Sequence, residues 1–295
     1  MMTKDMTEVW SKDFVPDGNR ASNVDRFTGF EDTYDQHRPE APQEVVALLT
    51  GYLGRKPSLV VDLGCGTGLS SFAWKDAADQ IIGVEPNDDM RGKAMAKLQS
   101  LQEEADGSHG AQLADIRFVS GYSNQLALPD QSADIITCSQ SFHWMDPAST
   151  LKEVSRVLRE EGIFAVYDCD WPPSLTWKVE QSYHELIEWA EATIDRHVEA
   201  QEKAYKGNKN EHLKHIRESG VFRFSKEIVF HHIEPFTAER YTGLAVSQGG
   251  IQTVFKLKQT ELNDKIAQFH ALVEEHFQGR TLPVMLSYRM RLGIK

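Results

Sequence analysis

The stretch VVDLGCGTGLSS, residues 60–71, constrains the fold more than any other part of the sequence. Three glycines stand at positions 64, 66 and 68, directly behind an apolar run. Glycine adopts positive φ and lets the backbone approach a ligand closely, and the start of a helix offers unpaired N–H groups. A strand, a glycine turn and a helix in that order are typical of nucleotide-binding α/β proteins. We therefore expect a strand at 59–61 and a helix over 68–78.

Strands and helices alternate along most of the chain. Helical spacing of apolar residues predicts helices at about 42–53, 88–104, 149–159, 238–246 and 260–278. Apolar runs predict further strands at 80–85, 116–120, 133–138, 162–168, 226–233 and 283–291. Such alternation indicates βαβ units. The predicted fold class is α/β: a Rossmann-like, seven-stranded, mostly parallel sheet with helices on both faces.

The regular alternation breaks after the fifth predicted strand. Trp171, Pro172 and Pro173 stop that strand, and a very polar stretch of helical pattern follows. We predict that 172–220 is a helical cap inserted after the fifth strand, because insertions at this edge of a sheet build binding sites. A main domain made of 23–171 and 221–295, and a polar N-terminal arm at 1–22, complete the predicted organisation.

The composition excludes several classes of protein. Acidic residues outnumber basic ones by 44 to 32, and the formal charge of −12 disfavours a nucleic-acid partner. No apolar run is long enough to span a membrane, so we expect a cytoplasmic protein with no membrane partner. Three distant cysteines indicate free thiols. Neither His212 with His215 nor the adjacent pair at 231–232 brings a third ligand, so we predict no metal site.

The spacing of the glycines bears on the choice of ligand. A dinucleotide fingerprint is G-x-G-x-x-G, but here the third glycine comes one place early, and Leu69 stands where the fingerprint has glycine. Asp62 would repel a pyrophosphate and attract an ammonium group. A cofactor with an amino acid, a nucleoside and no phosphate, which describes S-adenosylmethionine, suits the loop better. Glu85 ends the next strand and can accept both ribose hydroxyls in either kind of site.

Four motifs in order resemble those of class I S-adenosylmethionine-dependent methyltransferases. They are DLGCGTG at 62–68, VEPNDDM at 84–90, SGYSNQLALP at 120–129 and SQSFHWMD at 139–146. The last motif and YDQHRP at 34–39 resemble the small-molecule branch, methyltransferase type 11, which includes trans-aconitate methyltransferase-like proteins. The likeness covers about 25–170. It implies methyl transfer to a small molecule, with O-methylation favoured and a carboxylate as one acceptor group, and release of S-adenosylhomocysteine.

The resemblance also implies a set of cofactor contacts. Gly64, Gly66 and Gly68 would approach the methionine and ribose. Asp62 would lie near the methionine ammonium, Arg38 would meet its carboxylate, and Tyr34 would close over the cofactor. Glu85 would hold the ribose, with Pro86 and Met90 flanking the adenine. Tyr122 stands where the family usually has aspartate, so Ser123 or the backbone would contact the adenine amine. Gln140 would lie at the switch point of the sheet.

The acceptor site is less constrained by the sequence. His143 is either a general base, a donor to a carboxylate, or a packing residue beside Trp144. A carboxylate acceptor is already ionised at neutral pH and needs alignment only. Trp144, Trp171 and Tyr241 are candidate walls of the acceptor site. The candidate cations for an acidic acceptor are Arg196, Arg217, Arg240, Arg289 and Arg291. A non-catalytic S-adenosylmethionine-binding protein and a nucleotide-dependent oxidoreductase on a related fold remain alternatives.

Overall fold

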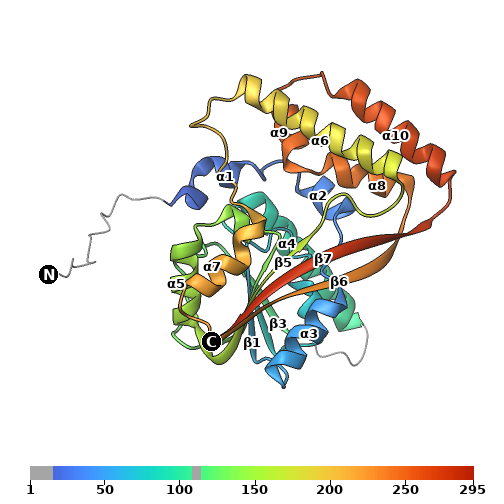
Figure 1. Ribbon diagram of the computed structural model, residues 1–295. Coiled ribbons are helices and arrows are strands. Elements are labelled where there is room, and N and C mark those ends of the chain that lie inside the picture. The colour runs from blue at the N-terminus through green and yellow to red at the C-terminus, as the bar shows by residue number, and fades with distance from the viewer. Residues whose placement is uncertain (1–15, 108–113) are drawn as a thin grey trace, which may run out of the picture.

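A computed structural model describes residues 16–107 and 114–295 of the protein (Figure 1). Its centre is a seven-stranded sheet in the order β3-β2-β1-β4-β5-β7-β6. The strands are β1 (Leu59–Leu63), β2 (Gln80–Val84), β3 (Asp115–Val119), β4 (Ala133–Ser139), β5 (Leu158–Cys169), β6 (Phe224–Phe236) and β7 (Leu282–Ile294). The predicted α/β class and the strand count are confirmed.

The directions of the strands locate the switch point of the sheet. β1 pairs in parallel with both β2 and β4, and β3 and β5 extend this parallel block outward. β7 runs antiparallel to its neighbours β5 and β6. Because the chain leaves β1 for β2 on one side and reaches β4 on the other, the switch point lies at the carboxyl ends of β1 and β4. In open α/β sheets, ligands bind at this point.

Helices cover both faces of the sheet, as predicted. α3 (Gln43–Leu53) and α4 (Asp88–Gly107) contribute Val45, Leu49 and Ala94 to the core on one face. α5 (Pro147–Val157) and α7 (His212–Glu218) pack on the other, where Leu151 and Ile216 are buried. Among residues 16–107 and 114–295, no helix has the length and apolar composition that crossing a membrane requires.

A helical layer lies over the carboxyl ends of the strands (Figure 1). It consists of α6 (Trp177–His197), α8 (Ala238–Val246), α9 (Gly249–Lys256) and α10 (Asn263–Phe277), whose buried residues form a core of their own. The cap after the fifth strand is thus present. α6 comes from the predicted cap segment, whereas α8, α9 and α10 come from the segment between β6 and β7, so the domain boundaries remain a prediction. The sequence analysis missed α9.

The N-terminal segment lies between this helical layer and the sheet (Figure 1). It forms the 3-10 helix η1 (Asp17–Asn19), α1 (Ala21–Asp25) and α2 (Glu31–His37). A Cβ atom added to Gly18 would lie 2.5 Å from the carbonyl oxygen of Trp144, so the backbones are in close contact. Within the predicted arm, 16–22 is therefore packed against the loop after β4. Positions 1–15 lie outside the described residues.

The helix predicted over 68–78 does not form. This stretch contains only the 3-10 helix η2 (Phe72–Trp74), where both aromatic side chains are buried. In an α-helix, residues two apart point in nearly opposite directions, so Phe72 and Trp74 could not both enter one core. The hydroxyls of Ser70 and Ser71 also both donate to Asp62, which holds the backbone in a tight turn.

Candidate functional site

Two adjoining cavities open at the carboxyl ends of the central strands. With the open solvent at their mouths included, the larger encloses about 750 Å³ and the smaller about 470 Å³. Tyr34, Gly64, Ser139 and Gln140 line both of them. Because these residues form a common wall, the cavities make one elongated crevice across the end of β1. This is the switch point of the sheet.

The glycine loop forms the floor of the crevice. Gly64, Gly66 and Gly68 all have positive φ, at 66°, 56° and 83°. A Cβ atom on Gly64 would lie only 2.7 Å from the Cβ atom of Ser141, so a larger residue would push against the loop after β4. The backbone of Gly64 and Gly66 lines the larger cavity directly. Since η2 is a single short turn, the loop has no helix N-terminus for a phosphate, in line with a phosphate-free ligand.

Asp62 lies beneath this loop. Its carboxylate is completely buried, with Oδ2 accepting from Ser70 Oγ at 2.5 Å and Ser71 Oγ at 2.7 Å, and Oδ1 from Thr137 Oγ1 at 3.0 Å. Burial raises the pKa of Asp62, and the three hydroxyl donors oppose that rise. Asp62 is not among the residues that line either cavity. In this structure its oxygens hold the loop in shape, and the expectation that Asp62 faces a bound ammonium group stays a prediction.

Glu85 lines the larger cavity, next to the glycine loop. It follows β2, and its Oε2 and Oε1 atoms accept from the backbone amides of Gly66 and Asn87, both at 2.9 Å. The side chain is buried but still lines the cavity. Burial raises the pKa of Glu85 to about 7, and the two amide donors only partly offset this effect. The carboxylate is therefore fixed to the glycine loop and poised to change charge near neutral pH.

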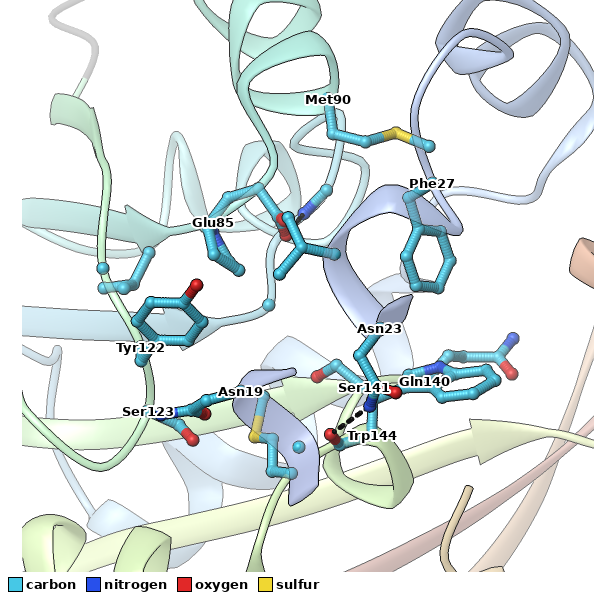
Figure 2. A pocket seen from close by; sticks show the side chains of 18 of the residues that line it. Asn19, Asn23, Phe27, Glu85, Met90, Tyr122, Ser123, Gln140, Ser141 and Trp144 are labelled. Carbon is cyan, nitrogen blue, oxygen red and sulfur yellow. Dashed lines mark hydrogen bonds between the residues drawn. The ribbon is translucent and has the colours of Figure 1, made fainter. Parts of the chain in front are cut away.

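The other residues predicted to surround a nucleoside lie in the larger cavity. Pro86, Met90, Tyr122 and Ser123 all line it, and Met90 is buried at its edge. Figure 2 shows Glu85 and Tyr122 on one side, with Trp144 and Gln140 on the other. The hydroxyl of Ser123 already pairs with Thr150 Oγ1 at 2.7 Å.

Tyr34, Arg38 and Gln140 gather at the smaller cavity, which they all line. Arg38 donates to Ser247 through Nε at 2.9 Å and Nη2 at 3.1 Å. Its guanidinium lies 5.1 Å from the ring centroids of both Tyr34 and Trp171. The structure thus brings these three predicted residues together: Arg38 lies in the smaller cavity, and Tyr34 and Gln140 lie on the wall that it shares with the larger one.

His143 points away from the crevice, contrary to the hypothesis of a catalytic base. It is 5% exposed and lines a separate cavity together with His212. Burial holds the pKa of His143 well below its usual range, and the nearby Lys209 lowers it further. Its Nδ1 atom lies 3.8 Å from Asp168 Oδ1. An enclosed imidazole that lines neither of the two adjoining cavities favours the packing role among the alternatives that the sequence left open.

His143, Asp168 and His212 form a cluster that the sequence spacing did not predict. Their candidate ligand atoms lie within 4.8 Å of one another, and all three side chains are buried. Two cations already pair with this carboxylate: Lys209 Nζ lies 2.9 Å from Oδ1, and Arg291 Nη1 lies 3.2 Å from Oδ2. A metal ion would have to compete with both, which disfavours a metal site here.

The remaining acceptor candidates differ in their placement. Trp144 lines the larger cavity, and Trp171 donates from Nε1 to Gln140 Oε1 at 3.3 Å. Tyr241 is wrong as a wall of the site, because it is fully buried in the core of the helical layer and donates to the carbonyl of Pro173. The five candidate arginines bond elsewhere: Arg196 to Glu261, Arg217 to Ser225, Arg240 to Glu234, Arg289 to Asp170, and Arg291 to Asp168 and Glu227.

Sequence reasoning missed two parts of the site. Asn19, Asn23 and Phe27 from the N-terminal segment line the larger cavity, and Asn23 Nδ2 donates to the carbonyl of Trp144 at 3.1 Å (Figure 2). Lys209, in the 3-10 helix η4 (Lys209–Glu211) directly before α7, reaches Gln140. Neither segment carries an apolar period or a motif, so no local signal points to these residues.

Comparison with known proteins identifies the domain. Residues 61–166 match the family model described as "Methyltransferase domain". The uncharacterized methyltransferase YcgJ of Bacillus subtilis is 32% identical over 110 residues, which cover 37% of this chain and 40% of YcgJ. The "Probable S-adenosylmethionine-dependent methyltransferase CRG1" of Saccharomyces cerevisiae is 27% identical over 136 residues, or 45% of this chain and 43% of the relative. The chain therefore matches less than half the length of these relatives.

Solved structures agree on the fold. A protein of Anaeromyxobacter dehalogenans, assigned as a candidate type II methyltransferase, superposes with a TM-score of 0.61 at 16% identity, covering 87% of this chain and 97% of the other. The crystal structure of YcgJ from Bacillus subtilis gives 0.50 at 19% identity, with coverage of 86% and 99%. Together, these matches show that residues 61–166 are similar to methyltransferase domains, and that the chain shares the fold of these solved structures.

Proposed function

We propose that the protein transfers the methyl group of S-adenosylmethionine to an oxygen atom of a small molecule, with a carboxylate as the favoured acceptor group. The observation that carries this proposal is the elongated crevice at the switch point, with the Glu85 carboxylate in the larger cavity, Arg38 in the smaller one, and Gln140 on the wall that they share. When bound, the cofactor supplies a methyl group activated on a sulfonium. The open space beside Gly66, where an added Cβ atom would meet nothing within 4 Å, leaves room for such a ligand against the backbone of the loop.

In this proposal the chain's own residues bind and orient the cofactor. Glu85 accepts hydrogen bonds from the ribose hydroxyls. Pro86, Met90 and Tyr122 enclose the adenine, and Ser123 or the backbone contacts its amine. Arg38 meets the methionine carboxylate, and Tyr34 closes over it. Asp62 holds the glycine loop in shape.

The lining of the crevice favours an acceptor that is already ionised. Among the described residues that line the two cavities there is no histidine. Burial raises the pKa of Tyr34, so its phenolate is scarce at neutral pH. A carboxylate needs no base, because it is ionised at pH 7. Alignment of its oxygen with the methyl group is then the main contribution of the protein.

Neighbouring structures support a small acceptor. A phosphoethanolamine N-methyltransferase of Haemonchus contortus, solved with phosphomonomethylethanolamine and S-adenosylhomocysteine, has a TM-score of 0.51 to this chain at 11% identity. The net charge of −12 also favours a small molecule over nucleic acid. We keep the cytoplasmic location as a prediction. The [4+2]-cyclase SpnF, with a TM-score of 0.50, shares the fold, so turnover must be measured directly.

The decisive experiment measures binding and turnover separately. Calorimetry with S-adenosylhomocysteine should show one site per chain. Incubation with S-adenosylmethionine and a panel of small carboxylates, alcohols and amines should then release S-adenosylhomocysteine, and a carboxylate product should gain the mass of a methyl group less a hydrogen. Binding without release for every compound in the panel would contradict methyl transfer, and NADH fluorescence enhancement would favour the oxidoreductase alternative.

A further inference from the structure

Gln140 has an unusual backbone for its position. It directly follows β4, and its φ of 52° lies in the left-handed region that residues other than glycine rarely adopt. Its backbone amide donates to the carbonyl of Tyr167 at 2.9 Å, which ties it to β5. Strained residues of this kind persist where the surrounding structure holds them, and they cluster at functional sites. Gln140 also lines both cavities of the crevice.

The surroundings of Gln140 fix the direction of its carboxamide. Trp171 Nε1 lies 3.3 Å from Gln140 Oε1, and Lys209 Nζ lies 3.2 Å from the same atom. An indole N–H and an ammonium group can only donate, so the amide oxygen must face both of them. The amide nitrogen, with two N–H donors, therefore faces the other way. Within 16–107 and 114–295, no hydrogen bond is found for Gln140 Nε2.

Lys209 is itself held in place by a buried carboxylate. Its ammonium lies 2.9 Å from Oδ1 of Asp168, which is 2% exposed, and Arg291 pairs with the second oxygen of Asp168. The side chain of Lys209 is 29% exposed, so it reaches Gln140 from the solvent side. The guanidinium of Arg38 lies against the ring of Trp171. The two groups that contact the amide oxygen of Gln140 are thus donors, and the carboxylates that line the two cavities with Gln140 are Glu85 in the larger and Glu40 in the smaller.

We propose that Gln140 donates from Nε2 to an anionic oxygen of the methyl acceptor, and that Lys209 is the positioning residue that keeps the amide in this direction. The inference rests on the proposed function and narrows it to small carboxylates over amines. An ammonium acceptor would meet only N–H donors at Nε2 of this amide, and the nearby ammonium of Lys209 would repel it. A hydroxyl acceptor would make one weaker, uncharged hydrogen bond.

The chemistry balances without a further reactant. One carboxylate oxygen is held by Gln140, and the other attacks the methyl carbon. A new oxygen–carbon bond forms, the carbon–sulfur bond breaks, and its electron pair stays on sulfur. The positive charge of the sulfonium and the negative charge of the carboxylate cancel, and no proton moves.

The sharpest test is Gln140→Glu. One carboxylate oxygen keeps the contacts with Trp171 and Lys209, while the second puts negative charge where the N–H donors were. We expect kcat/KM for carboxylates to fall by about 100-fold, chiefly through KM, because a charged hydrogen bond is replaced by repulsion. Affinity for S-adenosylhomocysteine should change less than about threefold. Unchanged kcat/KM, or an equal loss of S-adenosylhomocysteine affinity, would overturn the proposal.

The role of Lys209 needs a readout that loss of stability would not reproduce. Lys209→Met frees the amide to rotate, so KM for carboxylates should rise about tenfold with kcat nearly unchanged, and Lys209→Arg should restore most of the loss. Lys214→Met is the matched control, because Lys214 pairs with Glu211 on the surface of α7. Equal KM values for Lys209→Met and Lys214→Met would contradict the positioning role.

A binding measurement separates this inference from the proposed function. Straight-chain mono- and dicarboxylates and the matching alkylamines are titrated into the complex with S-adenosylhomocysteine, and saturation-transfer NMR detects bound ligand. Carboxylates should bind the parent protein and not Gln140→Glu. Binding without turnover would refute methyl transfer and leave the role of Gln140 standing. Stronger binding of amines than of carboxylates, or no carboxylate binding, would refute the role of Gln140.

Discussion

The carboxylate of Glu85 bonds directly to the glycine loop, with Oε2 accepting from the backbone amide of Gly66 at 2.9 Å. These two residues belong to different βα turns, and β1 and β2 place them side by side. The contact links the shape of the loop to the charge of one buried side chain. It also means that a ribose competes with two backbone amides for the same carboxylate oxygens.

The first prediction is that nucleoside binding weakens in mild acid. The pKa of Glu85 is about 7, and the ionised form is the one that accepts from both ribose hydroxyls. Affinity should be nearly full at about pH 8 and fall by about tenfold by about pH 6, as the ionised fraction drops. Calorimetry with 5′-methylthioadenosine measures this cleanly, because that ligand has no group that titrates in the interval.

The control for this pH effect is Glu85→Gln. It should bind 5′-methylthioadenosine more weakly than the parent at pH 8, with no slope between the two pH values. A slope that persists in Glu85→Gln would assign the effect to another group.

The second prediction concerns Asp62, whose role the structure places in the loop itself. Asp62→Ala leaves the hydroxyls of Ser70, Ser71 and Thr137 without their shared acceptor. Each buried hydroxyl that loses its partner costs about 1 kcal/mol or more, so unfolding in urea should show a loss of roughly 2–4 kcal/mol. Ser70→Ala removes a single donor and should cost about 1 kcal/mol. Equal stability of Asp62→Ala and the parent would contradict this structural role.

The third prediction separates backbone strain from steric conflict in the glycine loop. Gly64→Ala adds a Cβ atom 2.7 Å from that of Ser141, at a φ of 66°. Gly54→Ala, at the end of α3, has a similar φ of 74° and nothing within 4 Å of the new atom. Gly54→Ala should cost about 1–2 kcal/mol from strain alone. Gly64→Ala should cost more in urea unfolding and lose S-adenosylhomocysteine binding, whereas Gly54→Ala should keep it.

The sequence predicted the parallel sheet well because its signals are local. Apolar runs mark each strand, and the helical spacing of apolar residues predicted α5 at 149–159, close to its observed bounds, Pro147–Val157. The prediction of a helix over 68–78 was wrong, because Phe72 and Trp74 are both buried in a core whose position the local sequence pattern does not show.

Sequence patterns place those residues of the candidate site that directly follow a strand. Glu85 and Gln140 follow β2 and β4 directly, so their place at the crevice follows from the sheet. Lys209 and Asn23 reach the site from short helical segments whose positions are set by contacts far away in the sequence, such as the hydrogen bond from the Tyr205 amide to Asn23 Oδ1. His143 is adjacent in sequence to Trp144, which lines the larger cavity, but the side chain of His143 lines a separate cavity. Sequence spacing alone does not reveal this difference.

The last prediction tests whether His143 lies outside the catalytic site. Its neutral imidazole lines a cavity behind the loop after β4, beside Asp168 and His212. If this placement holds during turnover, His143→Gln should leave kcat within about threefold of the parent, whereas loss of a general base typically costs a factor of about 100 or more. The dependence of kcat on pH should keep its shape, because a group that is neutral throughout the working range adds no titration. Packing is still lost, so thermal unfolding should begin at a lower temperature than in the parent. A loss of turnover as large as that of a missing general base, restored by excess external imidazole, would place His143 in the chemistry after all.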